Sequence, residues 1–288
     1  MIYSITNGCI SAQISDIGAE LISVRGSDGF EYIWGADETY WDKHAPLLFP
    51  VCGRLVDQKY VFSGKEYRMD IHGFAKDSKF TVKNRTDDSL TLELSSSETT
   101  REIYPFDFSL TAQFSLKDAS LLVNFTVKNT GNSTLPYMLG WHPGFVLESD
   151  CPVSDFSLTF DRENIKLYPL QHGCFVSPSS CDYTLTDCKY FINDEQLAKV
   201  DTLIFRECGK SVTLGSEHTA HSLTLEWSET LPYFCIWKRP AAEARYVCLE
   251  PWSDVPSDGE SAENFETRRM SHLEKNVSKS FCCKISFK

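Results

Sequence analysis

Alternation of apolar and polar residues recurs along most of this 288-residue chain. It is clearest in "SLTLELSSS" (89–97), "SLLVNFTVKNTGNS" (120–133) and "HSLTLEW" (221–227), where apolar residues occupy every second position. Successive side chains of a β-strand point to opposite faces of its sheet, so this pattern predicts strands with one buried face. Helical periodicity is confined to short stretches such as "NDEQLAKV" (193–200). The chain is therefore expected to be all-β.

Turn signals separate the predicted strands. The stretch "KYVFSGKEYRM" (59–69) predicts a hairpin around Ser63-Gly64-Lys65. Short strands at regular spacing favour a sandwich or a barrel. Hydrophobic residues make up 42% of the chain, enough for a large core, and no linker, repeat or low-complexity stretch divides it. We expect one domain over residues 1–288, with few short helices.

The charge of the chain limits its partners. A formal net charge of −12 disfavours nucleic acids and anionic membranes, because both are polyanions. The beginning, "MIYSITNGCI", lacks the basic and apolar regions of a signal peptide, and no apolar run is long enough to span a membrane. The 11 cysteines are therefore expected to be reduced, and the protein cytoplasmic.

A regular cysteine spacing does not predict a metal site. Cys174, Cys181 and Cys188 recur every seven residues in "CFVSPSSCDYTLTDC". This segment contains proline and turn-forming residues and no C-x-x-C pair, so the spacing does not bring the thiols together. No metal is expected.

Two basic candidates lie in "LLFPVCGRLVDQKYVFSGKEYRMDIHGFAKD" (47–77). Arg54 follows a glycine that allows a sharp turn or a close backbone approach. Continued alternation through "YRMDIH" would put Arg68, Asp70 and His72 on one face. Alone, Arg54 is more simply a surface residue at a strand edge and His72 a half-exposed residue on a wet face.

A third candidate, His142, lies in "LGWHPGF". The residue before a proline favours extended backbone, and the neighbouring Trp141 offers a flat aromatic surface. Aromatic rings stack on the apolar C–H faces of sugars, so this segment could form the wall of a sugar site. A packed tryptophan corner with an incidental histidine explains it equally well.

The strongest single candidate is Glu250, in "RYVCLEPW". Val247 and Leu249 would point to one face, and Tyr246, Cys248 and Glu250 to the other, with Pro251 ending the strand. An ionised carboxylate on such an apolar face is costly to bury, and burial would raise its pKa towards that of a useful base. The alternative is a glutamate that turns out to solvent at the strand end.

Four of these segments together carry a resemblance. "PLLFPVCGRL", "YRMDIHGFAKD", "LPYMLGWHPGF" and "VCLEPW", in this order, resemble the aldose 1-epimerase (galactose mutarotase-like) family, in its LacX-like bacterial branch. Each motif is unspecific by itself, but four in order with β character between them form a strong signal. Weaker similarity covers nearly the whole chain.

The resemblance implies a large antiparallel β-sandwich with the active site on a concave sheet face. It implies that Arg54 and His72 bind a sugar near its ring oxygen, that His142 is the general acid and that Glu250 is the general base. Anomer exchange by these groups requires no metal, nucleotide or redox cofactor, so none is expected.

Other site residues are expected from the same resemblance. Asp201 in "KVDTLIF" is the candidate for positioning hydroxyl groups, and Trp237 and Trp252 could join Trp141 in an aromatic wall. Related sequences commonly read H-G-F-A-R, whereas this chain has Lys76 at the last position. Lysine lacks the bidentate fork of arginine, which leaves the substrate open.

The function expected is therefore that of an aldose 1-epimerase acting on a free hexose, a small-molecule sugar, as a monomer or homodimer. One alternative is a hexose-6-phosphate 1-epimerase, for which Arg54, Arg68 and Lys76 are the nearby cations. Another is a non-catalytic sugar-binding or sensing protein on the same fold. A glycosidase usually needs two carboxylates beside the bond, and the sequence offers one well-placed candidate, Glu250.

Overall fold

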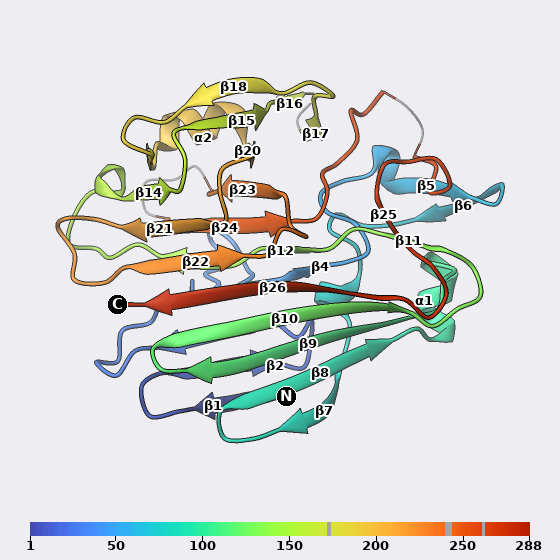
Figure 1. Cartoon of the computed structure of the whole chain (residues 1–288), viewed down its shortest axis with the longest axis horizontal. Helices are drawn as coiled ribbons and strands as arrows, with labels where there is room; N and C mark the ends of the chain where they lie inside the picture. The colour runs from blue at the N-terminus through green and yellow to red at the C-terminus, as the bar shows by residue number, and fades with distance from the viewer. Residues whose placement is uncertain (172–173, 240–243, 261–262) are drawn as a thin grey trace.

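Two large antiparallel sheets dominate the computed structural model, which describes residues 1–171, 174–239, 244–260 and 263–288 (Figure 1). The first sheet has nine strands. In spatial order they are β19 (Lys189–Phe191), β14 (Ser157–Phe160), β21 (Ser211–Gly215), β22 (Leu223–Trp227), β26 (Ser278–Phe287), β10 (Ser120–Asn129), β9 (Phe108–Lys117), β8 (Ser89–Ser95) and β7 (Thr81–Arg85).

The second sheet has eight strands. Its spatial order is β18 (Cys181–Thr184), β15 (Asn164–Tyr168), β20 (Thr202–Arg206), β23 (Tyr233–Trp237), β24 (Tyr246–Trp252), β12 (Gly140–Trp141) and β4 (Leu47–Leu48), with β13 (Gly144–Val146) also paired to β24.

Smaller elements complete the described chain. The strands are β1 (Ile2–Thr6), β2 (Ser11–Ser15) and β3 (Leu21–Arg25) in one sheet, and the pairs β5 (Lys59–Phe62) with β6 (Lys65–Arg68), β11 (Leu135–Tyr137) with β25 (Ser271–Leu273), and β16 (Leu170–Gln171) with β17 (Phe175–Val176). The helices are α1 (Glu98–Ile103) and α2 (Asp194–Val200), with 3-10 turns at Val56–Gln58, Ala75–Asp77 and Val153–Asp155.

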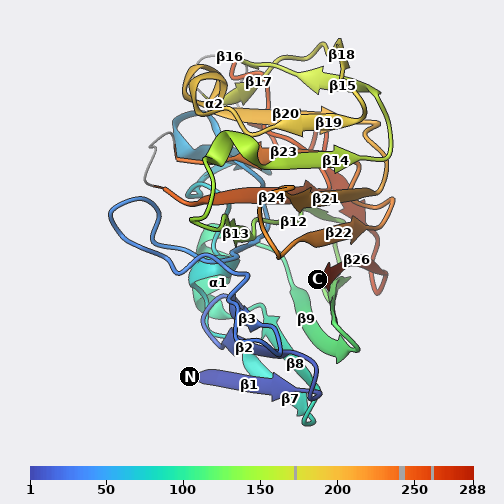
Figure 2. The ribbon, with the colours of Figure 1, turned by 90° about the vertical axis from the view of Figure 1, so that its left-hand side faces the viewer.

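The two large sheets pack face to face, as Figure 2 shows from the side. Phe125 of β10 lies 6.0 Å from Trp141 of β12, and Trp227 of β22 stacks at 4.6 Å on Phe234 of β23, measured between ring centroids. The predicted alternation is confirmed, because β8, β10 and β22 bury every second residue in this core. The expected antiparallel β-sandwich is therefore present.

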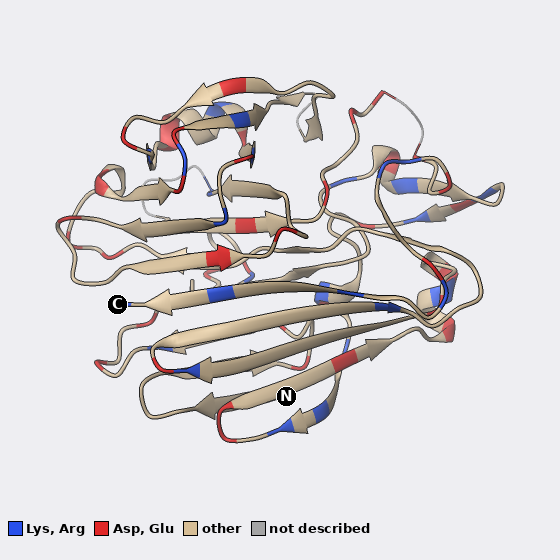
Figure 3. Cartoon of the chain, in the orientation of Figure 1, with Lys and Arg blue, Asp and Glu red and all other residues tan. Residues whose placement is uncertain are grey.

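The hairpin expected at residues 59–69 also forms, because β5 and β6 pair with Phe62 opposite Lys65. Ser63 and Gly64, the two turn residues, both have positive φ, as a tight hairpin turn requires. All 11 cysteines are free. In the described ranges, no helix has both the length and the apolar character to cross a membrane. Acidic and basic residues are interspersed along the chain, and much of the nine-stranded sheet is uncharged (Figure 3).

Candidate active site

A cavity of about 530 Å³ lies on the face of the eight-stranded sheet that points away from the sandwich core. Alternation along the strands supplies its floor. In β23, Phe234 and Ile236 belong to the core, whereas Trp237 borders the cavity. Thr202 and Ile204 of β20 and Glu250 and Trp252 of β24 border it in the same way. A sheet with one face buried in the sandwich thus offers its other face for chemistry.

Segments far apart in the sequence meet at this cavity. Of the nine residues expected to form the site, eight border it: Arg54, His72, Lys76, His142, Asp201, Trp237, Glu250 and Trp252. Three come from β23 and β24, Lys76 comes from the 3-10 turn Ala75–Asp77, and the others come from loops at the ends of strands or helices. The fold therefore gathers side chains that the sequence had suggested only one by one.

Glu250 comes from the central strand β24, in which every residue is buried. The expectation that Pro251 would end this strand is wrong, because β24 continues to Trp252. The amide of Leu249 donates to the carbonyl of Pro143, so the nitrogen of Pro251, two residues further, faces the same edge. On that edge the neighbouring chain is interrupted between β12 and β13. The missing N–H of the proline therefore costs no ladder hydrogen bond.

The carboxylate of Glu250 and the imidazole of His142 are in contact. Oε2 of Glu250 lies 3.2 Å from Nε2 of His142, and the two residues are 1% and 7% exposed. Burial raises the pKa of Glu250 well above its ordinary value, and the charge of Asp201 adds to this rise. Burial lowers the pKa of His142 to about 3. Burial thus disfavours both the ionised carboxylate of Glu250 and the protonated imidazole of His142.

Three buried atoms of this pair have no hydrogen-bond partner within the described residues. They are Nδ1 of His142 and both carboxylate oxygens of Glu250. Buried polar atoms are nearly always hydrogen-bonded, and orphans are costly. Because both side chains border the cavity, a polar ligand there could satisfy atoms that the protein leaves unpaired.

His142 lies in the break between β12 and β13, and its contacts hold it in place. Its backbone N–H donates to the carbonyl of Pro46, which anchors the interrupted segment. Trp41 stacks on the imidazole at 4.9 Å with an interplanar angle of 29°, and Trp237 approaches it edge-on at 5.7 Å. A Cβ at Gly144 would lie 2.8 Å from the indole of Trp41, so the glycine makes room for this stack.

His72 reaches the cavity by a different route from the one expected. The strand β6 ends at Arg68, so the predicted alternation to His72 is wrong. A turn closed by the Gly73 amide donating to the carbonyl of Asp70 carries His72 instead, with φ of 65°. Ile71 and His72 therefore both border the cavity, whereas an extended strand would separate them.

A backbone contact sets the tautomer of His72. The amide of Gly53 donates to Nδ1 of His72 at 3.0 Å. A neutral imidazole that accepts at Nδ1 carries its proton on Nε2. Burial, together with His142, Lys76 and Arg54, lowers the pKa of His72 well below its ordinary value. His72 is thus a neutral N–H donor, and its ring lies 5.6 Å from that of His142.

The expectation that Trp141 lines the site is wrong. Its indole is 1% exposed, donates to the carbonyl of Ala45 and packs edge-to-face on Phe125 in the core. Neighbouring residues of an extended segment point to opposite faces, so His142 and Trp141 cannot both face the cavity. Trp41, which the sequence reasoning missed, supplies the aromatic surface instead. It lies in "ETYWDKHAP", where a tryptophan among polar residues was the available signal.

Among the described residues, four cations border the cavity: Lys43, Arg54, Lys76 and Arg239. Lys43 and Lys76 both contact the carboxylate of Asp77. The side chains of Arg54 and Arg239 are exposed and make no ion pair with any described residue. Arg68 does not border the cavity, so it is not the phosphate ligand that the sequence suggested.

Asp201 stands at the end of α2 with φ of 61° and ψ of −67°. A non-glycine residue rarely adopts this conformation, which costs on the order of 1–3 kcal/mol. Such strain is typical of functional sites, and here it accompanies a carboxylate at the cavity.

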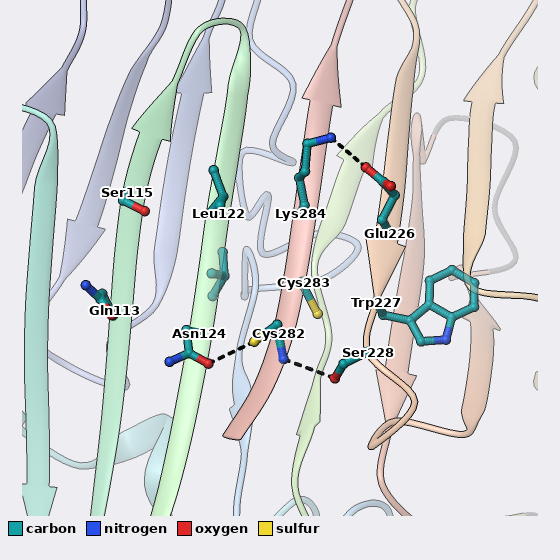
Figure 4. Close-up of a pocket in the computed structure, with 11 residues that line it drawn as sticks. Gln113, Ser115, Leu122, Asn124, Glu226, Trp227, Ser228, Cys282, Cys283 and Lys284 are labelled. Atoms are coloured by element: carbon teal, nitrogen blue, oxygen red, sulfur yellow. Dashed lines mark hydrogen bonds and ion pairs between the residues drawn. The ribbon is translucent and has the colours of Figure 1, made fainter. Parts of the chain in front are cut away.

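A groove of about 360 Å³ on the outer face of the nine-stranded sheet has a different character (Figure 4). Its one carboxylate among the described residues, Glu226, is paired with Lys284 at 2.7 Å. The thiol of Cys282 lies 3.1 Å from the side-chain oxygen of Asn124. Its carboxylate is already neutralised by a lysine, so the groove does not resemble a catalytic site.

Known proteins share this sequence pattern and fold. The chain matches the family model described as aldose 1-epimerase over residues 1–266. It is 26% identical over 288 residues to the plasmid-encoded protein LacX of Lactococcus lactis subsp. lactis, with 93% of each chain covered.

Two solved structures are similar over the whole chain. A galactose mutarotase related enzyme from Lactobacillus acidophilus has a TM-score of 0.93 at 31% identity, covering 100% of this chain and 97% of its own. A galactose mutarotase-like protein from Lactobacillus casei has a TM-score of 0.93 at 28% identity, covering 100% of both chains. With the family match over most of its length, the chain belongs to the aldose 1-epimerase family.

Proposed function

We propose that the protein is an aldose 1-epimerase that interconverts the α and β anomers of a hexose by opening and closing the sugar ring. The observation that carries this proposal is the contact between Glu250 and His142. A carboxylate and an imidazole, both buried and 3.2 Å apart, border a cavity large enough for a pyranose. The C1 hydroxyl and the ring oxygen of a pyranose are bonded to the same carbon, so an adjacent base and acid can reach both.

Ring opening needs two proton transfers. Glu250 takes the proton of the C1 hydroxyl while His142 gives a proton to the ring oxygen. The bond between C1 and the ring oxygen breaks, and the C1 hydroxyl becomes the carbonyl of the open-chain aldehyde. After rotation about the C1–C2 bond, Glu250 gives its proton to the carbonyl oxygen while His142 takes back the proton of the hydroxyl that had been the ring oxygen. That oxygen attacks C1 from the other face and closes the ring. General acid–base catalysis of this kind contributes roughly 10²–10⁴-fold to a rate.

The proton count of the pair suits this cycle. A carboxylate with an imidazolium holds as many protons as a carboxylic acid with a neutral imidazole. Burial favours the neutral form of the pair. A bound sugar that donates to Glu250 and accepts from His142 would favour the charged form, which is the form needed to open the ring.

His72 and Arg54 would stabilise the ring oxygen. His72 is held as an Nε2–H donor by Gly53, and Arg54 brings a positive charge to the same cavity. Preorganised donors aimed at developing negative charge can supply several kcal/mol, about 3–4 kcal/mol for one donor in known cases. Trp41, Trp237 and Trp252 offer apolar surface to the C–H faces of the sugar.

A hexose 6-phosphate is the second candidate substrate. Lys43 and Lys76 already share Asp77, but Arg54 and Arg239 make no ion pair in the described parts of the chain. An anionic substituent at the rim of the cavity would satisfy them. Glucose 6-phosphate and glucose compared in the same assay separate the two candidates.

The test is catalysed anomer exchange, measured by NMR exchange spectroscopy on a panel of free and phosphorylated aldoses at equal concentration. We expect at least one sugar to show cross-peaks between its anomers whose intensity grows with protein concentration. Spontaneous exchange without protein is the baseline. A panel in which no sugar exchanges faster than this baseline would contradict the proposed activity and would leave a binding protein as the better account.

A further inference from the structure

Three consecutive carbonyls, those of residues 44–46, accept hydrogen bonds from the segment that carries His142. The pairs are Gly144 N to His44 O at 2.8 Å, Trp141 Nε1 to Ala45 O at 3.2 Å and His142 N to Pro46 O at 3.1 Å. His142 itself lies between β12 and β13, outside any strand. The place of its imidazole therefore depends on where residues 44–46 are held.

A single carboxylate holds this segment. Residues 44–46 also lie outside any strand, so their backbone N–H groups need partners other than a sheet ladder. Oε1 of Glu20 accepts from the amide of His44 at 2.7 Å and from that of Ala45 at 3.1 Å. Pro46 has no N–H, so this one oxygen accepts from every backbone N–H of the segment. The side chain of Glu20 is 14% exposed, and an ionised acceptor makes these hydrogen bonds stronger than a neutral one would.

The turn that carries Glu20 is fixed in its own right. It joins β2 to β3, and the amide of Ser15 donates to the carbonyl of Glu20 at 2.8 Å. The amide of Gly18 donates to the carbonyl of Ser78 at 2.8 Å, and a Cβ at Gly18 would lie 2.5 Å from the carbonyl oxygen of Lys76. Lys76 borders the cavity. The turn thus packs directly against a part of the chain that belongs to the site, which leaves the carboxylate of Glu20 little freedom to move.

We propose that Glu20 is a positioning residue for the proton transfer at His142, acting through residues 44–46. This inference rests on the proposed function, since it assumes that His142 is the acid. Glu20 is not one of the described residues that border the cavity, so it would not touch the sugar. Nε2 of His142 must reach the ring oxygen while it stays beside Glu250, now 3.2 Å away. A misplacement of about 1 Å at a reacting group can lower a rate about 100-fold, so the oxygen of Glu20 controls the reaction from a distance.

Two small substitutions separate the position of this oxygen from its charge. Glu20→Asp keeps the charge but withdraws the oxygen by one methylene, whereas Glu20→Gln removes the charge and keeps an oxygen at the same reach. With the aldose that the native protein exchanges fastest, kcat should fall roughly 10- to 100-fold in Glu20→Asp while KM stays within about twofold. In Glu20→Gln, kcat should stay within about threefold of the native value. A kcat of Glu20→Asp that equals or exceeds that of Glu20→Gln, or a change in KM alone, overturns the inference.

Asp161 provides a matched control. Its Oδ2 also accepts from two consecutive backbone amides, those of Lys210 at 2.8 Å and Ser211 at 2.9 Å, and it is not one of the described residues that border the cavity. Asp161→Ala should lower the unfolding midpoint and leave kcat within about twofold of the native value. If Asp161→Ala lowers kcat as much as Glu20→Asp does, the loss follows from general destabilisation, and the positioning role of Glu20 is contradicted.

Nitrogen-15 NMR of the histidine rings tests the position of His142 without any sugar. The variant His142→Gln identifies the signals of His142 among those of the 7 histidines. Because Nε2 of His142 contacts Glu250, its signal should move in Glu20→Asp and stay in place in Glu20→Gln and Asp161→Ala. Unchanged signals of His142 in Glu20→Asp overturn the inference, whatever the rates. Absence of catalysed exchange by the native protein contradicts the proposed function instead, and the NMR comparison then decides by itself whether Glu20 places His142.

Discussion

Nε2 of His142 meets Oε2 of Glu250 at 3.2 Å, although one comes from the gap between β12 and β13 and the other from the buried middle of β24. Two ionisable groups this close titrate as a pair. Burial pushes their pKa values in opposite directions, upward for Glu250 and downward for His142. One shared proton therefore stays with the pair over a wide range of pH.

This pairing predicts an unusual pH dependence. The pair gains a second proton only near the lowered pKa of His142, about 3, and loses its proton only near the raised pKa of Glu250. We expect kcat/KM to stay constant as the pH falls through 6.5, the ordinary pKa of histidine. A profile between pH 4.5 and 8 measures this. A rate that halves near pH 6.5 would show an ordinary, unpaired histidine.

Trp41 borders the cavity and Trp141 lies in the core, so substitutions at these two positions should have different effects. Trp41→Ala removes the ring that stacks on His142, and an aromatic contact is worth about 0.5–1.5 kcal/mol, so kcat/KM should fall roughly 2- to 13-fold with little change in folding. Trp141→Phe is the contrasting control in the core. It should lower the free energy of unfolding by about 1–3 kcal/mol and leave kcat/KM within twofold.

Rates and denaturant unfolding curves of the two tryptophan variants distinguish these effects. If Trp41→Ala loses stability instead of activity, the stack on His142 belongs to the structure and not to the site. If Trp141→Phe loses activity with unchanged stability, the placement of Trp141 in the core is contradicted.

Two glycines with the same φ test the turn that carries His72. Gly73 and Gly64 both have φ of 73°, so alanine is strained at either position. A Cβ at Gly73 would lie 2.2 Å from the carbonyl oxygen of Phe49, whereas nothing lies within 4 Å at Gly64. Gly64→Ala should cost about 1 kcal/mol of stability with normal activity. Gly73→Ala should cost more than that and also lower kcat, because His72 must shift.

Thermal unfolding and kcat of both glycine variants decide the matter. If both variants lose the same stability and keep the same activity, the turn at Gly73 accommodates a Cβ without moving His72. That result would contradict the predicted clash with the carbonyl oxygen of Phe49.

A histidine outside the site links stability to pH. Nε2 of His221 lies 2.7 Å from Asp28 and Nδ1 lies 3.1 Å from Glu148, while Phe30 stacks on the ring at 3.8 Å. Burial opposes the charged ring, but the bonds to the two carboxylates outweigh it and raise the pKa of His221. A raised folded-state pKa stabilises the fold below the unfolded value near 6.5, and this contribution disappears as the pH rises through the folded value.

The comparison is between the native chain and His221→Gln by urea unfolding. The difference in unfolding free energy should be larger at pH 5.5 than at pH 9. The hydrogen bond with His221 lowers the pKa of Asp28. The contribution should therefore also decline below about pH 4, as the carboxylate of Asp28 gains a proton and its bond to the charged ring is lost. A difference that does not vary between pH 5.5 and 9 would contradict a charged His221.

Much of the sandwich could be predicted from the sequence, because a half-buried strand has a period of two residues that survives in the one-dimensional pattern. β8, β10 and β22 illustrate this. The same reasoning separates Tyr246, Cys248 and Glu250 from Val247 and Leu249 on the two faces of β24. In the structure, Val247 and Leu249 belong to the main core and Glu250 borders the cavity.

Features that depend on contacts between segments far apart in the sequence could not be predicted from this alternation. Pro251 stays inside β24 because the neighbouring chain is interrupted beside it, and His72 faces the cavity through a left-handed turn held by Gly53 and Gly73. Trp41 borders the cavity because the fold brings its loop against His142. Trp141 faces the core because adjacent residues of an extended segment point to opposite faces and His142 faces the cavity.

The central claim is that Glu250 is the base that opens the sugar ring, and Glu250→Gln tests it most directly. Glutamine keeps the size of the side chain and removes the base. With the aldose that exchanges fastest under the native protein, NMR exchange spectroscopy should show the catalysed rate falling at least about 100-fold. The unfolding midpoint should not fall, because a neutral amide replaces a group whose charge is costly to bury. Exchange by Glu250→Gln at the native rate would remove Glu250 from the mechanism and contradict this account.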